Sequence, residues 1–84
     1  MSVCFSSNAR DDYLFWQKTD RRTLKRVDQL IKATLREPFD GPAKPEPLRH
    51  GLAGYWSRRI DYEHRMVYKI VDGTLVIAQL RYHY

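Results

Sequence analysis

Cysteine and long apolar runs are what this sequence most clearly lacks. Its single cysteine, Cys4, cannot form an internal disulfide bond, which excludes the small secreted folds that such bridges hold together. No apolar segment approaches the roughly 20 residues of a membrane-spanning helix, and the N-terminus lacks the apolar stretch of a signal peptide. We therefore expect a soluble protein of a reducing cytoplasm, with no membrane partner.

Motifs for metal, phosphate-loop and acyl chemistry are also absent. The chain has no Gly-rich phosphate loop, no Cys or His pair at metal-ligand spacing, and no serine in a nucleophile elbow. We therefore expect no metal and no cofactor, so any catalysis would depend on ordinary acidic, basic and cationic side chains.

Acidic residues are the minority among the charged ones. Fifteen Lys and Arg against ten Asp and Glu give a formal net charge of +5 in 84 residues. This excess indicates an anionic partner, with nucleic acid as the first candidate, although composition alone leaves an ordinary soluble surface equally open. A chain this short closes one hydrophobic core, which predicts a single domain over residues 1–84.

The first half of the chain has the apolar periodicity of two helices. Apolar residues recur at spacings of three and four in two stretches: Ala9, Tyr13 and Trp16, then Leu24, Val27, Ile31 and Leu35. Asn8 with Asp11 approximates a capping box for the first helix, and Asp20 caps the second. Pro38 restricts the residue before it, so the second helix should end near Arg36. These segments predict an antiparallel helical hairpin.

Basic residues crowd the first turns of the second predicted helix: Arg21, Arg22, Lys25 and Arg26. Positive charge at a helix N-terminus opposes the macrodipole. We therefore favour a contact with phosphate or with an acidic partner over a merely solvated helix face.

The second half predicts a meander of three antiparallel strands: Gly54–Ile60, Arg65–Val71 and Thr74–Tyr82. At Asp72-Gly73 two hairpins are available, a two-residue turn that pairs Val71 with Thr74 or a three-residue loop, and they turn opposite faces toward the core. We favour the three-residue loop, because apolar even-numbered residues then match: Met66, Tyr68 and Ile70 with Val76, Ala78 and Leu80. The run Val3–Phe5 predicts one more strand, either edge or central.

Together these elements predict an α+β fold in which an antiparallel β-sheet is packed on one face by the N-terminal helical hairpin. In the favoured register the odd-numbered residues form a basic face: Ser57, Arg59, Arg65, Lys69, Gln79, Arg81 and His83. A solvated face does not require so many cations with one histidine, so we interpret it as an anion site. Beside it, the proline-rich loop of residues 37–51 presents Glu46 with an extended backbone between Pro45 and Pro47.

RNA cleavage suits these residues, because RNA carries its own nucleophile in the 2′-hydroxyl group. The reaction needs a base for that hydroxyl, cations for the crowded phosphorus, and an acid for the 5′-oxygen. Glu46, Arg59 with Arg65, and His83 supply these three roles. Imidazole is the side chain whose ordinary pKa, about 6.5, lies nearest physiological pH.

Four segments in order along the chain also carry a family resemblance: Lys-Pro-Glu-Pro-Leu at 44–48, Gly-Tyr-Trp-Ser-Arg-Arg-Ile at 54–60, Glu-His-Arg-Met-Val-Tyr at 63–68 and Arg-Tyr-His-Tyr at 81–84. The sequence resembles the Txe/YoeB branch of the RelE superfamily of bacterial type II toxins over essentially the whole chain. The resemblance implies a RelE-like (microbial RNase) fold and a metal-independent endoribonuclease of the bacterial cytoplasm. Such an enzyme cuts messenger RNA in the A site of the 70S ribosome and leaves 2′,3′-cyclic phosphate ends.

The resemblance further implies residue roles and partners. In the family the glutamate matching Glu46 is the general base, and the histidine matching His83 is the general acid. The arginines matching Arg59 and Arg65 contact the scissile phosphate, and the terminal tyrosine matching Tyr84 helps to shape the site. A YefM-like antitoxin with an acidic, flexible segment is the implied inhibitor. Because members of the branch can be dimers, a homodimer is a further expected partner.

Three more basic residues complete the predicted RNA-binding set: Lys44, Arg49 and Arg81. Arg49 stands where the family often has lysine, and its planar guanidinium group is not equivalent to a point charge. The alternative function is a non-catalytic basic module that binds RNA or the ribosome and inhibits translation by occupancy.

Structural interpretations are favoured for the other polar and aromatic candidates. We expect Glu63 to pair with Arg65, and His50 and His64 to be surface or turn-stabilising residues. Cys4 is predicted to be a small buried hydrophobic residue. Tyrosines that are exposed could stack a nucleobase: Tyr55, Tyr82 or Tyr84.

Overall fold

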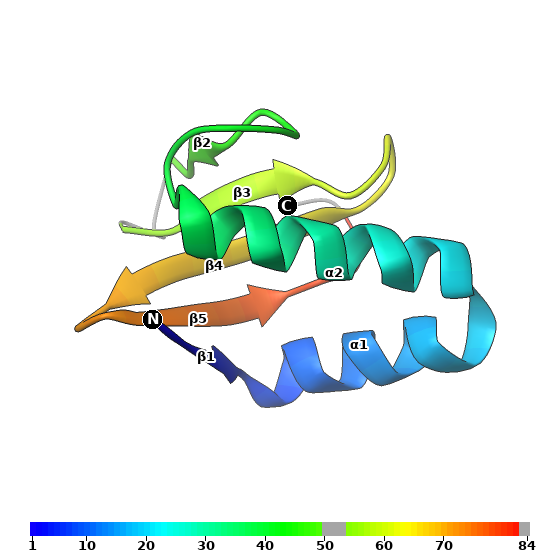
Figure 1. Ribbon diagram of the computed structural model, residues 1–84. Helices are drawn as coiled ribbons and strands as arrows, with labels where there is room; N and C mark the ends of the chain where they lie inside the picture. The colour runs from blue at the N-terminus through cyan, green and yellow to red at the C-terminus, as the bar shows by residue number, and fades with distance from the viewer. Residues whose placement is uncertain (50–53, 83–84) are drawn as a thin grey trace.

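A computed structural model, which describes residues 1–49 and 54–82, has two helices packed on one face of a five-stranded sheet (Figure 1). The elements are β1 (Ser2–Phe5), α1 (Ser7–Thr19), α2 (Arg21–Arg36), β2 (Glu46–Pro47), β3 (Trp56–Arg59), β4 (Arg65–Val71) and β5 (Thr74–Gln79). The strand order is β1-β5-β4-β3-β2. The predicted α+β class and the helical hairpin on one sheet face are thereby confirmed.

The two helices begin at residues whose side chains accept free backbone N–H groups. Ser6 caps α1, and its hydroxyl accepts from the N–H of Ala9 at 3.0 Å. Asn8 is therefore not the cap that we predicted, because it already lies inside the helix, where its side chain donates to the Ala78 carbonyl at 3.4 Å. Asp20 caps α2 as predicted, accepting two N–H groups of the first turn at 3.1 Å each. The predicted end of α2 is also confirmed.

The predicted meander is confirmed as β3, β4 and β5, and two edge strands extend it. At one edge β1 pairs with β5 in parallel, so the sheet is mixed rather than wholly antiparallel as we predicted. This edge position leaves Cys4 exposed, so the prediction of a buried residue is wrong. At the other edge, β2 pairs Glu46 with Ser57 and Pro47 with Trp56, within a segment predicted to be a loop. A sheet edge is where a strand can accommodate a residue that has no N–H.

The predicted register of the β4–β5 hairpin is wrong. Residues 72 and 73 form a two-residue turn, with φ angles of +47° and +73°, and Val71 pairs with Thr74. An Asp-Gly pair suits such a turn, because both central residues need positive φ. The fully buried residues of β5 are consequently Leu75 and Ile77.

A β-bulge explains why the apolar pattern misled the prediction. The ladder is regular from the turn to Tyr68, but Val67 then pairs with Gln79, which leaves Ala78 as an extra residue. Beyond the bulge the facing of the chain is reversed relative to a regular strand. Leu80 therefore lies in the core, as the even-numbered pattern predicted, although the register that led to this prediction is wrong.

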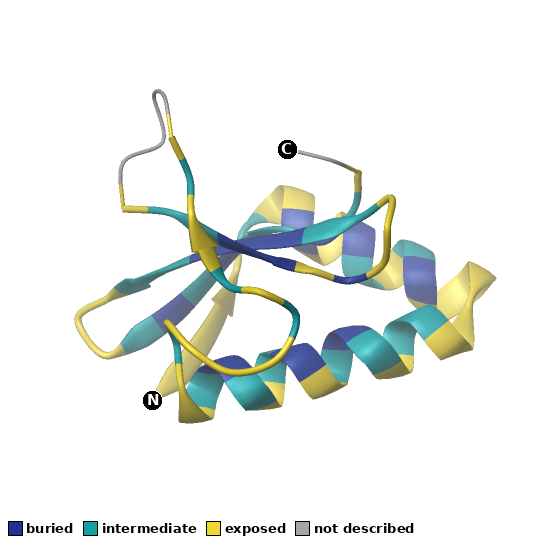
Figure 2. Ribbon diagram, turned by 90° about the horizontal axis from the view of Figure 1, so that it is seen from above, coloured by how far each residue is buried: buried dark blue, intermediate teal, exposed yellow. Residues whose placement is uncertain are grey.

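The core lies between the helices and the sheet, where Figure 2 shows the buried residues. Its fully or almost fully buried members come from both layers: Ala9, Trp16, Val27, Leu30, Ile60, Met66, Tyr68, Leu75, Ile77 and Leu80. Trp16 is thus a core residue, as expected. Within the described residues, neither helix has the length and apolar character needed to cross a bilayer.

Candidate functional site

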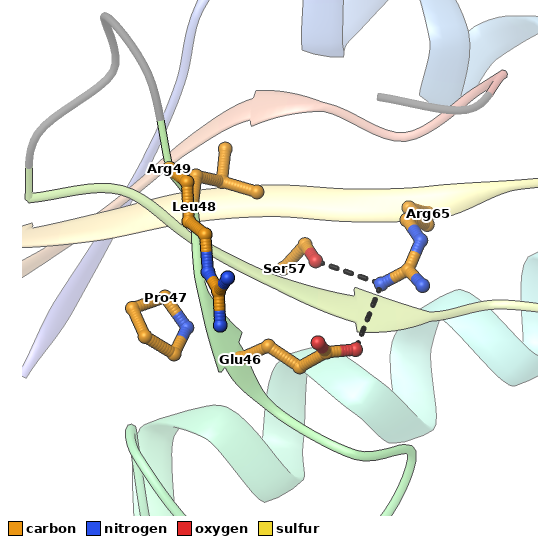
Figure 3. A pocket seen from close by; sticks show the side chains of 6 residues that line it. All are labelled: Glu46, Pro47, Leu48, Arg49, Ser57 and Arg65. Atoms are coloured by element: carbon orange, nitrogen blue, oxygen red, sulfur yellow. Dashed lines mark hydrogen bonds and ion pairs between the residues drawn. The ribbon is translucent and has the colours of Figure 1, made fainter.

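A hollow of about 280 Å³ opens beside strands β2, β3 and β4 (Figure 3). Its lining combines charged, polar and apolar residues: Glu46, Pro47, Leu48, Arg49, Ser57 and Arg65. The hollow lies on the sheet face away from the helices, because the next residues along β3 and β4, Arg58 and Met66, are buried on the helix side. The structure therefore brings together three of the predicted site residues: Glu46, Arg49 and Arg65.

Glu46 is positioned by the edge strand β2. Its backbone is extended between two prolines, as predicted, and it pairs with Ser57 of β3. The pairing continues through a hydrogen bond from the N–H of Leu48 to the carbonyl of Tyr55 at 2.9 Å. The side chain of Glu46 remains 55% exposed. The sheet thus fixes the backbone of the carboxylate while leaving the carboxylate accessible.

Arg65 makes the central polar contacts of the hollow. Its Nη1 donates to Ser57 Oγ at 2.9 Å and lies 3.6 Å from Glu46 Oε1 (Figure 3). Ser57 is almost completely buried, so its hydroxyl fixes the direction in which the guanidinium group enters the hollow. The sequence placed Ser57 on this face but gave it no role. The available signal was that Ser57 and Arg65 lie on the same sheet face in adjacent strands, where a hydroxyl group can accept a hydrogen bond from the arginine.

The other predicted cations lie outside the lining of the hollow. Arg59 is exposed and stands opposite Arg65 in the β3–β4 ladder. Lys44 is exposed in the turn that precedes β2. Arg81 is directed toward α1, where its guanidinium carbon lies 3.4 Å from the centroid of the Phe15 ring, so its predicted place on the basic face is wrong.

One predicted ion pair, at the turn between β3 and β4, is wrong. Glu63 does not pair with Arg65; its Oε1 lies 3.8 Å from Nε2 of His64, and its side chain is 58% exposed. Asp61 closes this turn, because its Oδ1 accepts the backbone N–H groups of Glu63 and His64 at 2.8 Å each. Three candidates cannot be compared with the prediction because they lie outside the described residues: His50, His83 and Tyr84.

A second arginine, Arg58, supports the site from the core. It is fully buried and donates to the main-chain carbonyls of Glu37, Asp40 and Pro42, in the segment that leads from α2 to β2. Its Nε also donates to the hydroxyl of Tyr68 at 3.3 Å. Sequence analysis missed this role. The available signal was a charged residue at an even-numbered, core-facing position of β3.

The hydroxyl group of Tyr68 completes this buried network. It donates to the Pro38 carbonyl at 2.6 Å while accepting from Arg58. Burial raises the pKa of the Tyr68 hydroxyl above 10.0, and the hydrogen bond from Arg58 partly opposes that rise. A protonated phenol is required for the donated bond, so the burial supports the contact that holds the loop.

The hollow combines a proton acceptor with a group that binds anions. Two arginines against one glutamate give its lining a net positive charge, which suits a phosphate group. The carboxylate of Glu46 can accept a proton from a substrate bound beside Arg65. In the part of the chain that the structure describes, no histidine lines the hollow, so a general acid would have to come from elsewhere.

Comparison with protein families matches nearly the whole chain. Residues 5–84 match the family model for the YoeB-like toxin of bacterial type II toxin–antitoxin systems. A related protein, Toxin YoeB from Escherichia coli (strain K12), is 55% identical over 84 residues, which is 100% of both chains.

Solved structures give the same result for the fold. The YoeB/ParE toxin from Agrobacterium tumefaciens has a TM-score of 0.96 at 46% identity and covers 100% of both chains. YoeB from Staphylococcus aureus was solved as a dimer (TM-score 0.93, 40% identity) and in a YoeB–YefM complex (TM-score 0.92, 39% identity), each covering 100% of this chain and 98% of that one. The expected RelE-like fold is thereby confirmed.

Proposed function

Because the chain belongs to the family of YoeB-like toxins of bacterial type II toxin–antitoxin systems, we propose that it is an endoribonuclease that cuts messenger RNA in the ribosomal A site. In the proposed reaction the RNA 2′-hydroxyl attacks the adjacent phosphorus without a metal. The products are a 2′,3′-cyclic phosphate and a 5′-hydroxyl end, and translation stops at the cut codon.

The observation that carries this proposal is the contact between Glu46 and Arg65. A general base and a phosphate-binding cation must act on atoms of one nucleotide, and Oε1 and Nη1 are only 3.6 Å apart. An incoming phosphate would compete with the carboxylate for Arg65. The displaced carboxylate of Glu46 would then be free to take the proton of the 2′-hydroxyl group.

The surrounding cations are assigned to the charge that develops on phosphorus. Arg65 is held in place by Ser57, Arg59 stands opposite it, and Arg49 lines the same hollow. Guanidinium groups fixed before the reaction stabilise a transition-state anion without the cost of reorienting solvent. Lys44 is proposed as a further RNA contact at the periphery, whereas Arg81, which is directed toward α1, is not.

The proposed general acid is His83, and Tyr84 is proposed to help shape the site. Both assignments depend on the sequence resemblance. His83 directly follows Tyr82, the last described residue, whose carbonyl accepts the N–H of Arg65 at 3.0 Å. The chain therefore reaches His83 from a residue bonded to the backbone of an arginine that lines the hollow, which supports the assignment.

A YefM-like antitoxin is the proposed protein partner. The S. aureus relative was solved in a YoeB–YefM complex, and in this chain the charge of +5 and the arginines of the hollow favour an acidic partner segment. Such a segment would occupy the surface proposed for the RNA backbone. The S. aureus dimer supports a homodimer as a second proposed assembly, and the proposed place of action is the 70S ribosome in the bacterial cytoplasm.

Mapping the ends of an mRNA incubated with ribosomes and purified protein tests this function. We expect 2′,3′-cyclic phosphate ends at A-site codons. We expect Glu46→Gln to lower the single-turnover cleavage rate by roughly 10²- to 10⁴-fold, because the amide cannot act as a base. Affinity for the ribosome should change little, since the substitution removes no positive charge.

Glu37→Gln is the matched control, because Glu37 is also an exposed glutamate of the segment between α2 and β3 but does not line the hollow. This variant should cleave at the wild-type rate. Inhibition of translation with no cut RNA would favour the occupancy module over the nuclease. Undiminished cleavage by Glu46→Gln would show that Glu46 is not the base.

A further inference from the structure

The last described residues of the chain are fastened by side chains from distant elements. At Leu80, the backbone N–H donates to Asp12 Oδ2 at 3.0 Å and the carbonyl accepts from Trp16 Nε1 at 2.9 Å. At Tyr82, the N–H donates to Nδ1 of His64 at 2.7 Å and the carbonyl accepts from the N–H of Arg65 at 3.0 Å. Helix α1 and the start of β4 therefore hold this segment on both sides of residue 81.

The imidazole of His64 is itself held in position. Only 11% of its side chain is exposed, and its ring meets the ring of Trp16 edge to face with centroids 4.9 Å apart. Asp61 accepts the backbone N–H of His64 at 2.8 Å, and the His64 carbonyl accepts from Ile60 at 2.9 Å. The ring is thus a fixed acceptor rather than a surface side chain that meets the segment by chance.

The hydrogen bond from Tyr82 determines the tautomer of His64. A backbone N–H can donate only to an unprotonated ring nitrogen, so Nδ1 must be bare. The ring proton then belongs on Nε2, which faces Glu63 Oε1 at 3.8 Å. The contact therefore requires the neutral imidazole, with its proton on the Glu63 side.

The backbone of Tyr82 explains why such fastening is needed. Its φ angle is +69°, in the left-handed region that residues with a side chain seldom adopt. Such a conformation persists only where the surroundings enforce it. The bonds to His64 and Arg65 act on the N–H and the carbonyl of this one residue, and so hold it in that conformation.

We infer that His64 is a positioning residue for the catalytic site, which holds the backbone N–H of Tyr82 so that the chain continues to His83 from a fixed point. We call the hydrogen bonds of His64 and Arg65 with the backbone of Tyr82 the clasp. Arg65 links the clasp to the hollow, because its backbone binds Tyr82 while its side chain contacts Glu46. The inference depends on the proposed function only for the role of His83. The clasp itself does not depend on it.

Two substitutions separate the acceptor from the ring. His64→Asn keeps an acceptor oxygen near the position of Nδ1 but loses the ring that packs on Trp16, whereas His64→Phe keeps a ring but cannot accept. We expect exchange of the Tyr82 amide hydrogen, measured by NMR, to be roughly 2- to 10-fold faster in His64→Phe and close to wild type in His64→Asn. Wild-type protection in His64→Phe, or lost protection in His64→Asn alone, would overturn the inference.

Cleavage on ribosomes provides the functional measurement. His64→Phe should lower the single-turnover rate on the order of 10- to 100-fold with little change in ribosome affinity, because a displaced acid misses its target atom. His64→Asn should restore most of the rate. If the wild-type protein cuts no RNA, the proposed function fails while the exchange experiment still decides the clasp. Equal rates in wild type and His64→Phe would contradict the positioning role.

A third test uses the wild-type protein alone and therefore does not depend on whether a variant folds. The ¹⁵N chemical shifts of the His64 ring distinguish a bare nitrogen from a protonated one. The hydrogen bond from Tyr82 predicts a bare Nδ1 with the proton on Nε2. A proton on Nδ1 would exclude the bond from Tyr82 and with it the inference.

Discussion

Arg58 and Arg65 lie on neighbouring strands, but Arg58 holds a loop in place whereas Arg65 is open to the hollow. Arg58 is fully buried, and its guanidinium group is surrounded by three main-chain carbonyls and the Tyr68 hydroxyl. Arg65 is 20% exposed, and within the described residues its guanidinium group makes its contacts through Nη1 alone. The same side chain therefore holds a loop where its donors are occupied, and is available to a ligand where they are not.

Removing Arg58 should have the largest effect on stability. In Arg58→Met the partly buried carbonyls of the loop and the buried Tyr68 hydroxyl lose their donor, and each buried group left unsatisfied costs about 1–3 kcal/mol. We expect the free energy of unfolding to fall by about 3 kcal/mol or more. Chemical denaturation with urea measures this change.

A loss below about 1 kcal/mol in that experiment would show that the contacts of Arg58 are replaceable by water. The contrast between the two arginines would then no longer hold. Because this loop leads into β2, which carries Glu46, a folded Arg58→Met protein should also show lower cleavage activity than the wild type, if the proposed function holds.

The matched substitution, Arg65→Met, should show the opposite balance. Within the described residues its ion pair, with Glu46 at 3.6 Å, is partly exposed, so the free energy of unfolding should change by less than about 1 kcal/mol. Cleavage should fall by roughly 10²- to 10³-fold, because the proposed contact of this cation with the phosphate is lost. Single-turnover kinetics and urea denaturation of the same preparation separate the two effects. A variant that is unstable but cleaves normally would reverse the assignment.

Tyr68→Phe, which removes one hydroxyl from the Arg58 network, should destabilise the protein less than Arg58→Met does. We expect a loss of about 1–2 kcal/mol in the free energy of unfolding near neutral pH. The raised pKa of Tyr68 also gives a pH dependence. Its contribution is fully present below pH 10.0, the ordinary value, and is lost as the pH rises through the higher pKa of the folded state.

Alkaline unfolding curves measure this dependence. Wild-type stability should decline more steeply above pH 10.0 than that of Tyr68→Phe, which has no proton to lose at this position. Parallel curves for the two proteins would show that Tyr68 titrates alike in the folded and unfolded states.

The sequence predicted the parts of the molecule that depend on local pattern. The spacing of apolar residues predicted the helices, and Pro38 predicted where the second one ends. The two prolines around Glu46 predicted its extended backbone. The chemistry of RNA cleavage also placed Glu46 and Arg65 in one site, although the predicted ion-pair partner of Arg65 was Glu63. These features depend on residues close in sequence or on the known chemistry of a single side chain.

What the sequence did not predict depends on pairing between distant residues. The bulge at Ala78 reversed the facing of β5, so a fixed even-odd rule chose the wrong turn. The roles of Arg58, Ser57 and His64 each require a partner from another element. A charged residue on an apolar face is a visible signal, but the carbonyls that satisfy it become identifiable only when the loop has been placed.

The bulge also determines how many residues β5 can contain before its side chains change the face to which they point. Ala78 is the extra residue between Ile77, which faces the core, and Gln79, where the ladder resumes; Leu80, one position later, faces the core again. Deleting Ala78 would leave a regular alternation in which Gln79 still faces away from the helices and Leu80 still faces them, whereas a strand that kept this residue without the bulge would turn Gln79 toward the helices and Leu80 outward. The bulge therefore accommodates one additional residue in β5 without changing which side chains beyond it face the core.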